Sequence, residues 1–161
     1  MPDRKAQDVI LTFGNDFKGD DGAGTYFGSL IHDLPGMLVI NGGDSPENNS
    51  GAIQALMPER IVIVDALNFG GNAGEWTIVP SRLFDGASIS THGSFGLLVS
   101  YLAMSTGAEI FLIGIQPESI GLGDGLSISV KTAVEKLAAR IMDDAGVDRI
   151  LEDERHWLSV R

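Results

Sequence analysis

The chain has 161 residues, a length that fits one domain, and its 43% hydrophobic and 20% charged residues are the balance of a globular protein. Its 22 acidic and 11 basic residues give a net charge of −11, which disfavours nucleic acid and anionic membranes as partners. Cysteine is absent, which excludes disulfides, thiolate metal sites and a cysteine nucleophile. Without a signal-peptide core or an apolar stretch of transmembrane length, the chain is expected in the cytoplasm.

Short apolar segments predict strands, several of them apolar on successive residues, as in strands covered on both faces. They are Val9–Phe13, Met37–Ile40, Ile61–Val64, Trp76–Val79 and Ile110–Ile115. Helical patterns lie between or after them, at Gly22–Leu34, Glu47–Leu56, Ser94–Ser105 and around Val130–Ile141. Strands that alternate with helices predict a single three-layer α/β/α domain with a mostly parallel twisted sheet. We expect its core at about residues 8–143, with 148–161 as a tail or terminal helix.

The corner between the first strand and the first helix, Phe13–Gly24, is the most informative part of the sequence. Glycine-rich corners of this kind commonly hold a phosphate at a helix N-terminus. Here Asp20 and Asp21 lie at the start of the helix, where carboxylates suit the helix dipole but would repel a phosphate. The corner is therefore interpreted as a site for a cation or a proton.

Three side chains with metal-binding chemistry follow different strands. Asp21 comes after the first strand, Asp65 ends the third, and His92 precedes the third helix. Because the carboxyl ends of parallel strands meet at one edge of a sheet, these residues are candidates for one divalent-metal site.

Each candidate also has a purely structural interpretation. A carboxylate at a helix start can act as an N-cap, and Asp20 fits that role better than Asp21. Asp65 could cap a turn with Asn68 and Gly70, and a lone loop histidine such as His92 is more often structural or solvated than a ligand.

Other catalytic motifs are missing or weak. The sequence has no P-loop, no Gly-x-Ser-x-Gly elbow and no His-Glu-x-x-His motif, and its likeness to a dinucleotide fingerprint is poorly spaced. Two loops are longer than connectivity requires, Gly42–Asn48 and Gln116–Gly125, and long ordered loops are often functional.

Several short motifs resemble the maturation endopeptidases of nickel–iron hydrogenases, in family order and over about residues 9–140. They are Gly14-Asn15, Gly19–Gly24, Gly42–Asn48, Ile63–Ala66 with Gly74-Glu75, Thr91-His92 and Gly114–Pro117. The segment Gly42–Asn48 resembles the branch that processes formate-hydrogenlyase-type and methanogen hydrogenases. The chain departs from the pattern at Asp21, where many members have glutamate, and at Thr12, where many have glycine.

The resemblance implies a peptidase, aspartic-type by family assignment. Its substrate would be a hydrogenase large-subunit precursor, from which it removes a C-terminal extension after nickel insertion. By motif position, Asp21, Asp65 and His92 would bind metal and act in catalysis, and nickel would be presented by the precursor, with other divalent metals as substitutes. The attacking water could be activated by a carboxylate or by the metal. Asp16, Asp44 and Glu47 could add polar contacts, and the Gly121–Gly125 loop could contact the precursor's tail.

Three alternatives stay open from the sequence. The first is a non-catalytic nickel-binding assembly factor on the same scaffold, which would bind the precursor without cutting it. The second is a nucleotide-binding α/β protein, and the third is a peptidase of the spore-germination type. The sequence leaves the oligomeric state open, with a monomer among the options.

Overall fold

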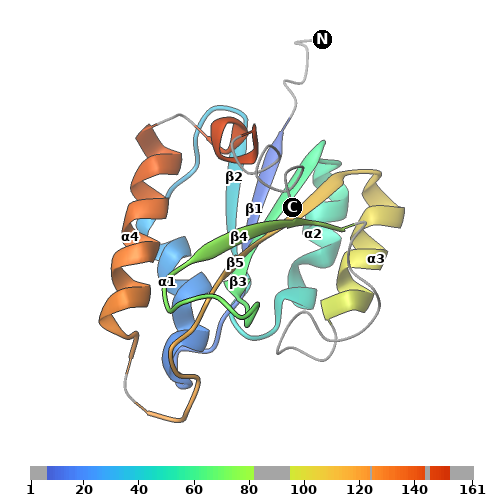
Figure 1. The fold of residues 1–161 in the computed structure, drawn as a ribbon. Coiled ribbons are helices and arrows are strands. Elements are labelled where there is room, and N and C mark those ends of the chain that lie inside the picture. Colours follow the sequence, from blue (N-terminus) through green and yellow to red (C-terminus); the bar gives the residue numbers. More distant parts are fainter. Residues whose placement is uncertain (1–6, 82–94, 124, 144–145, 153–161) are drawn as a thin grey trace.

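The computed structural model describes residues 7–81, 95–123, 125–143 and 146–152, which build a sheet between two layers of helices (Figure 1). Its strands are β1 Asp8–Thr12, β2 Met37–Asn41, β3 Arg60–Ala66, β4 Trp76–Pro80 and β5 Glu109–Ile115. Every predicted strand is confirmed, with ends that shift by one or two residues.

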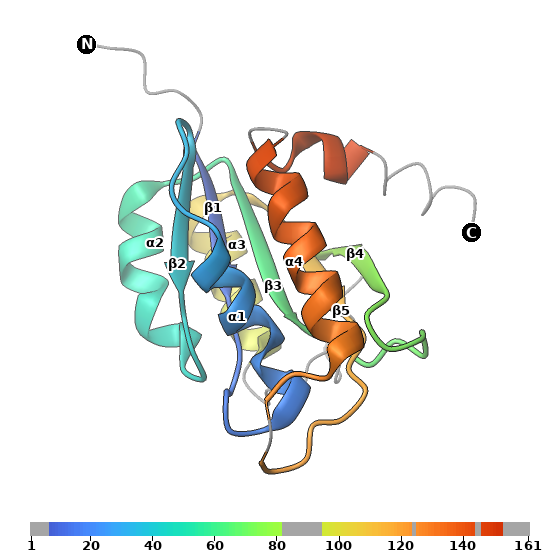
Figure 2. The ribbon, with the colours of Figure 1, turned by 90° about the vertical axis from the view of Figure 1, so that its left-hand side faces the viewer.

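Helices α1 and α4 cover one face of the sheet, and α2 and α3 cover the other (Figure 2). Their bounds are α1 Ala23–Leu30, α2 Ser50–Leu56, α3 Phe95–Thr106 and α4 Ile128–Asp143, with 3-10 turns η1 Gly19–Gly22 before α1 and η2 Pro46–Asn49 before α2. This arrangement confirms the predicted three-layer α/β/α class. None of the described helices is long and apolar enough to cross a membrane.

The strand order is β2-β1-β3-β5-β4, with every neighbouring pair parallel except β4 and β5. Strand β4 runs opposite to β3 and β5 because the connection between β3 and β4 is short and contains no helix. A parallel arrangement would need a longer crossover to return the chain to the opposite edge of the sheet. The carboxyl ends of β1, β2, β3 and β5 therefore meet at one edge.

The core has two halves, one on each side of the sheet. Strand β3 shows the division, since Val62 and Val64 pack towards α1 and α4, while Ile61 and Ile63 pack towards α2 and α3. All of these side chains are fully buried. Strands buried on both faces explain why the sequence shows continuous apolar runs in place of alternation.

The first helix is shorter than predicted, since α1 ends at Leu30 and not at Leu34. The backbone becomes extended at Ile31, and Leu34 pairs with Met37 across the Pro35-Gly36 turn. Ile31 stays buried in this extended segment and Leu34 packs against the same half of the core, so the apolar pattern continues after the helix has ended.

Candidate active site

Asp21 lies in η1, the turn between β1 and α1, and its side chain is buried. The backbone on both sides of it is fixed by hydrogen bonds. The Asp21 N–H donates to the carbonyl of Lys18 at 3.0 Å, and the Asp21 carbonyl accepts from the N–H of Asn15 at 3.0 Å. The Asp21 side chain is thus carried by a folded turn at the carboxyl end of β1.

Gly24 allows this turn to approach the sheet. A Cβ atom at Gly24 would lie 1.9 Å from the carbonyl oxygen of Phe13 and 2.5 Å from that of Val64. Only glycine permits the start of α1 to pack so closely on the ends of β1 and β3. Since η1 also contacts β3, the turn that carries Asp21 lies next to the strand that carries Asp65.

Asp65 is the penultimate residue of β3, and its carboxylate is buried at the carboxyl edge. Its Oδ1 atom accepts a hydrogen bond of 2.8 Å from the N–H of Ala66. The turn that Asp65 could have capped is capped by Asn68, whose Oδ1 accepts from the N–H of Gly70 at 3.3 Å. Carboxylates are ligands that divalent cations accept, so two of them at one edge of the sheet could contribute to a cation site.

His92, the third predicted ligand, lies outside the described residues. Within the described part of the chain, no group of three or more histidine, cysteine, aspartate or glutamate side chains could hold a metal ion. The residues that this structure brings to one edge are therefore Asp21 and Asp65, and the complete trio stays a prediction.

Asp20 has a role that the sequence did not indicate. Its side chain is 1% exposed, and its carboxylate accepts from the N–H groups of Glu118, Ser119 and Ser127 at 2.7–3.1 Å and from the Ser127 hydroxyl at 2.9 Å. The prediction that Asp20 caps the helix start is wrong, because its donors come from the distant connection between β5 and α4. Asp20 ties that connection to η1, beside Asp21.

Gln116 organises the loop that follows Asp65. Its Oε1 accepts from the N–H groups of Phe69 at 2.9 Å and Gly71 at 3.1 Å, and its Nε2 donates to Asn68 Oδ1 at 3.1 Å. The sequence signal was a glutamine directly after a buried strand, but only the fold shows which loop it holds.

The loop after β2 brings exposed carboxylates to the same end of the sheet. Asp44 and Glu47 are both exposed, and Glu47 lies in the first turn of η2. The loop is joined to the first corner by the N–H of Gly14, which donates to the carbonyl of Gly43 at 2.9 Å. A polar role for Asp44 and Glu47 at the site stays a prediction.

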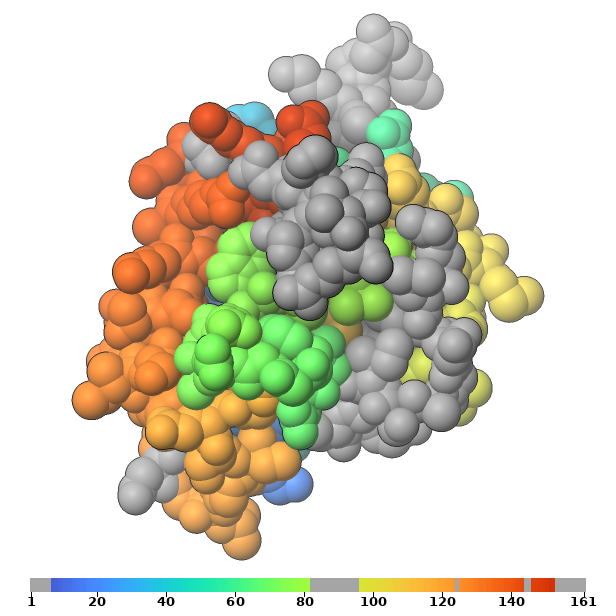
Figure 3. Space-filling view, viewed as in Figure 1, coloured from blue at the N-terminus to red at the C-terminus, as the bar shows by residue number. Residues whose placement is uncertain are grey.

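A hollow of about 790 Å³ lies between the loop after β3 and helix α4. Its lining combines Phe69 and Trp76 with Glu75 and Lys136. Figure 3 shows this loop and β4 in green beside the orange side chains of α4 and the segment before it.

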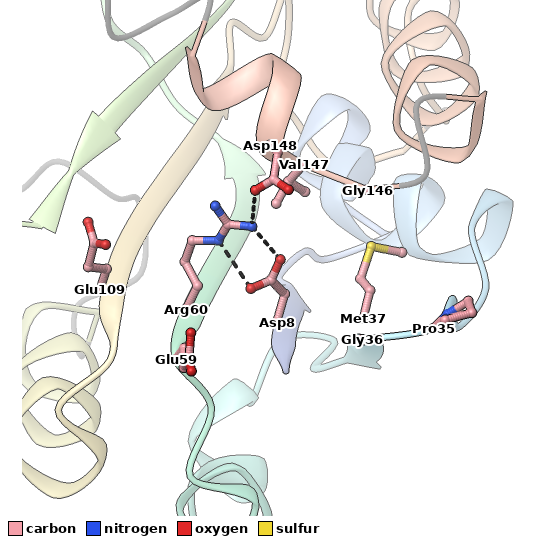
Figure 4. A pocket seen from close by; sticks show the side chains of 10 residues that line it. All are labelled: Asp8, Pro35, Gly36, Met37, Glu59, Arg60, Glu109, Gly146, Val147 and Asp148. Atoms are coloured by element: carbon pink, nitrogen blue, oxygen red, sulfur yellow. Dashed lines mark hydrogen bonds and ion pairs between the residues drawn. The ribbon is translucent and has the colours of Figure 1, made fainter. Parts of the chain in front are cut away.

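A second hollow, of about 510 Å³, includes the amino-terminal ends of strands and is lined by Arg60 between two carboxylates (Figure 4). The Arg60 guanidinium bonds Asp8 through two nitrogens and reaches Asp148 Oδ1 at 2.6 Å. Burial lowers the pKa of Arg60, but hydrogen bonds to Asp8 and Asp148 outweigh it, so the pKa is raised and the charge is permanent. This cluster ties residues 146–152 to the sheet and is a structural feature.

The comparisons with known proteins agree over most of the chain. The family model described as HycI, hydrogenase maturation protease, matches residues 30–144. The chain is 38% identical over 138 residues to the hydrogenase 3 maturation protease of Escherichia coli K12, with 83% of this chain and 88% of that relative covered.

Solved structures give the same result. The [NiFe] hydrogenase maturation protease HycI of Thermococcus kodakarensis KOD1 has a TM-score of 0.78 and 38% identity, over 88% of this chain and 93% of that one. The solution structure of endopeptidase HycI from Escherichia coli has a TM-score of 0.75 and 33% identity, over 87% and 92% of the two chains. Sequence and fold are therefore similar over the same large part of each chain.

Proposed function

This chain belongs to the hydrogenase maturation protease family and is an endopeptidase, and on that premise we propose that it removes the C-terminal extension of a nickel–iron hydrogenase large-subunit precursor after nickel insertion. The observation that carries the proposal is the position of two buried carboxylates, Asp21 and Asp65, on adjoining elements at the carboxyl edge of the sheet. Such an edge is where parallel α/β sheets bind their ligands.

Asp21, Asp65 and His92 would engage the nickel that the precursor already holds. Two carboxylates and an imidazole are good ligands for a divalent transition metal, and nickel is substrate cargo in this scheme. Nickel recognition would then align the scissile bond, and alignment alone supplies roughly 7–11 kcal/mol in well-oriented reactions. An unloaded precursor would lack this alignment and stay uncut.

The test is a cleavage assay with the nickel-loaded large-subunit precursor from the same source, followed by intact mass. The wild-type protein should remove the extension, and the same precursor without nickel should stay whole. Asp21→Asn, Asp65→Asn and His92→Ala should each lower the rate by roughly 100-fold or more. Asp21→Glu should keep activity, since the longer side chain retains the charge.

Matched controls use the same substitutions at exposed positions. Asp143→Asn at the end of α4 and His32→Ala beyond α1 should both cut at the wild-type rate. Circular dichroism of every variant separates a lost ligand from a lost fold. Equal cleavage of the precursor with and without nickel would show that nickel has no role in recognition. Tight binding of the precursor without any loss of mass would favour an assembly factor.

A further inference from the structure

Three large apolar side chains are exposed on the two segments that Asp20 joins. Phe17 is 79% exposed, Ile120 46% and Leu122 86%, and together we call them the apolar lip. Exposed apolar side chains are common singly, but a group of them on adjoining segments commonly marks a binding surface.

Hydrogen bonds hold the two segments of the apolar lip side by side. The N–H of Gly123 donates to the carbonyl of Phe17 at 3.2 Å, Lys18 and Gly123 form an isolated β-bridge, and the N–H of Asp20 donates to the carbonyl of Ser119 at 2.8 Å. Figure 2 shows η1 in blue beside the orange connection from β5 to α4.

The backbone at the lip is also tightly packed. Gly19 has a φ of +53°, and a Cβ atom there would lie 2.7 Å from the carbonyl oxygen of Ser119. Together with the four hydrogen bonds to the Asp20 carboxylate, this packing holds Glu118, Ser119 and Ser127 against η1. A preformed surface loses little conformational entropy when it binds.

The apolar lip is continuous with the candidate active site, because Asp20, which anchors it, directly precedes Asp21. An endopeptidase binds its substrate chain on both sides of the cut bond, so the chain that reaches this edge must cross a neighbouring surface. Among the described residues next to the apolar lip, Asp16 and Glu118 are exposed acidic side chains and Lys18 is an exposed basic one. With a net charge of −11, the protein also favours a basic partner over a second copy of itself.

We propose that the apolar lip of Phe17, Ile120 and Leu122 is the docking surface for a segment of the polypeptide substrate that carries apolar and basic side chains. The inference rests on the proposed function for the identity of that polypeptide. In this proposal the apolar lip binds a part of the precursor chain that lies away from the nickel. Substitutions in the lip should therefore change KM more than kcat.

The test compares the double variant Phe17→Ser/Leu122→Ser with the control Leu97→Ser/Met104→Ser. The control residues lie on α3 and are 77% and 89% exposed, so the chemistry and exposure of the two pairs match. With the nickel-loaded precursor, the lip variant should raise KM about tenfold or more and leave kcat within about twofold, because apolar anchors commonly dominate binding. The control should keep both constants, and added salt should raise KM of the wild type.

Other results would overturn the proposal. These are an unchanged KM in the lip variant, an equal loss in the control, or a fall in kcat alone. A wild-type dimer that the lip variant dissociates in sedimentation velocity would assign the lip to self-association. If the wild type binds the precursor without cutting it, the proposed function is wrong, and the lip variant and the control are then compared by their Kd for the precursor. If the wild type neither binds nor cuts the precursor, both proposals are wrong.

Discussion

The carboxylate of Asp20 accepts hydrogen bonds from both the backbone N–H and the hydroxyl of Ser127, at 2.7 and 2.9 Å, although the two residues are 107 positions apart. This contact joins the corner after β1 to the start of α4. The two parts of the chain that border the candidate active site are therefore joined by a buried carboxylate.

Replacing Asp20 should show how much this contact contributes to stability. In Asp20→Asn, an amide NH₂ group replaces an oxygen that faces only donors, so we expect the free energy of unfolding in urea to fall by about 3 kcal/mol. The exposed Asp143→Asn should stay within about 0.5 kcal/mol of wild type. Equal stability of the two variants would mean that the Asp20 contacts contribute nothing.

Two glycines in helices should respond to alanine in opposite directions. Gly24→Ala should lower the free energy of unfolding by roughly 3 kcal/mol or more, because its Cβ would meet backbone oxygens of Phe13 and Val64. Gly51→Ala in α2 has open space around it and should raise stability by about 0.5–1 kcal/mol. Urea unfolding of both variants measures this, and a mild effect at Gly24 would contradict the close approach of α1 to the sheet.

Gln116 should act as a positioning residue for the loop after Asp65. In Gln116→Ala, the N–H groups of Phe69 and Gly71 lose their acceptor, so their hydrogen-exchange protection should fall. Cleavage of the precursor should slow roughly tenfold through kcat, since misplaced groups lower the rate of the chemical step.

The control for Gln116 is the exposed Gln54, whose Oε1 accepts from the hydroxyl of Tyr101 at 2.8 Å. Gln54→Ala removes a glutamine of the same size on α2 and should leave kcat unchanged. Unaltered exchange at Phe69 and Gly71 in Gln116→Ala would show that the loop holds its shape without that side chain.

Tyr26 should titrate above the ordinary range for tyrosine. Its hydroxyl donates to Glu135 Oε1 at 2.7 Å, and this hydrogen bond, followed by partial desolvation and the charge of Glu135, raises the pKa of Tyr26. Because the folded pKa is the higher one, the contribution to stability is present below about pH 10 and is lost as pH rises through the folded value.

Absorbance titration can measure this in Tyr101→Phe, which leaves Tyr26 as the remaining tyrosine of the two. Its midpoint should lie above about 10, and the added change Glu135→Ala should return it to about 10. If Glu135→Ala leaves the titration midpoint of Tyr26 unchanged, the contact between Tyr26 of α1 and Glu135 of α4 is contradicted.

The sequence was sufficient for the elements and for the fold class. Continuous apolar runs such as Ile61–Val64 predicted strands buried on both faces, and the fold class followed from their alternation with helices. The rule that parallel strands end at one edge was enough to group Asp21 with Asp65 from their positions in the chain. These inferences depend on local patterns, which one sequence contains.

The tertiary structure decided which distant groups meet. From the sequence, Asp20 was expected to cap the helix start, but the fold gives it four donors from residues 118–127 and places η1, which carries Asp21, beside β3. The strand order, the end of α1 at Leu30 and the partners of Gln116 were equally beyond local pattern. Hydrogen bonds between residues about 100 positions apart depend on how the whole chain packs, so only the folded molecule determines them.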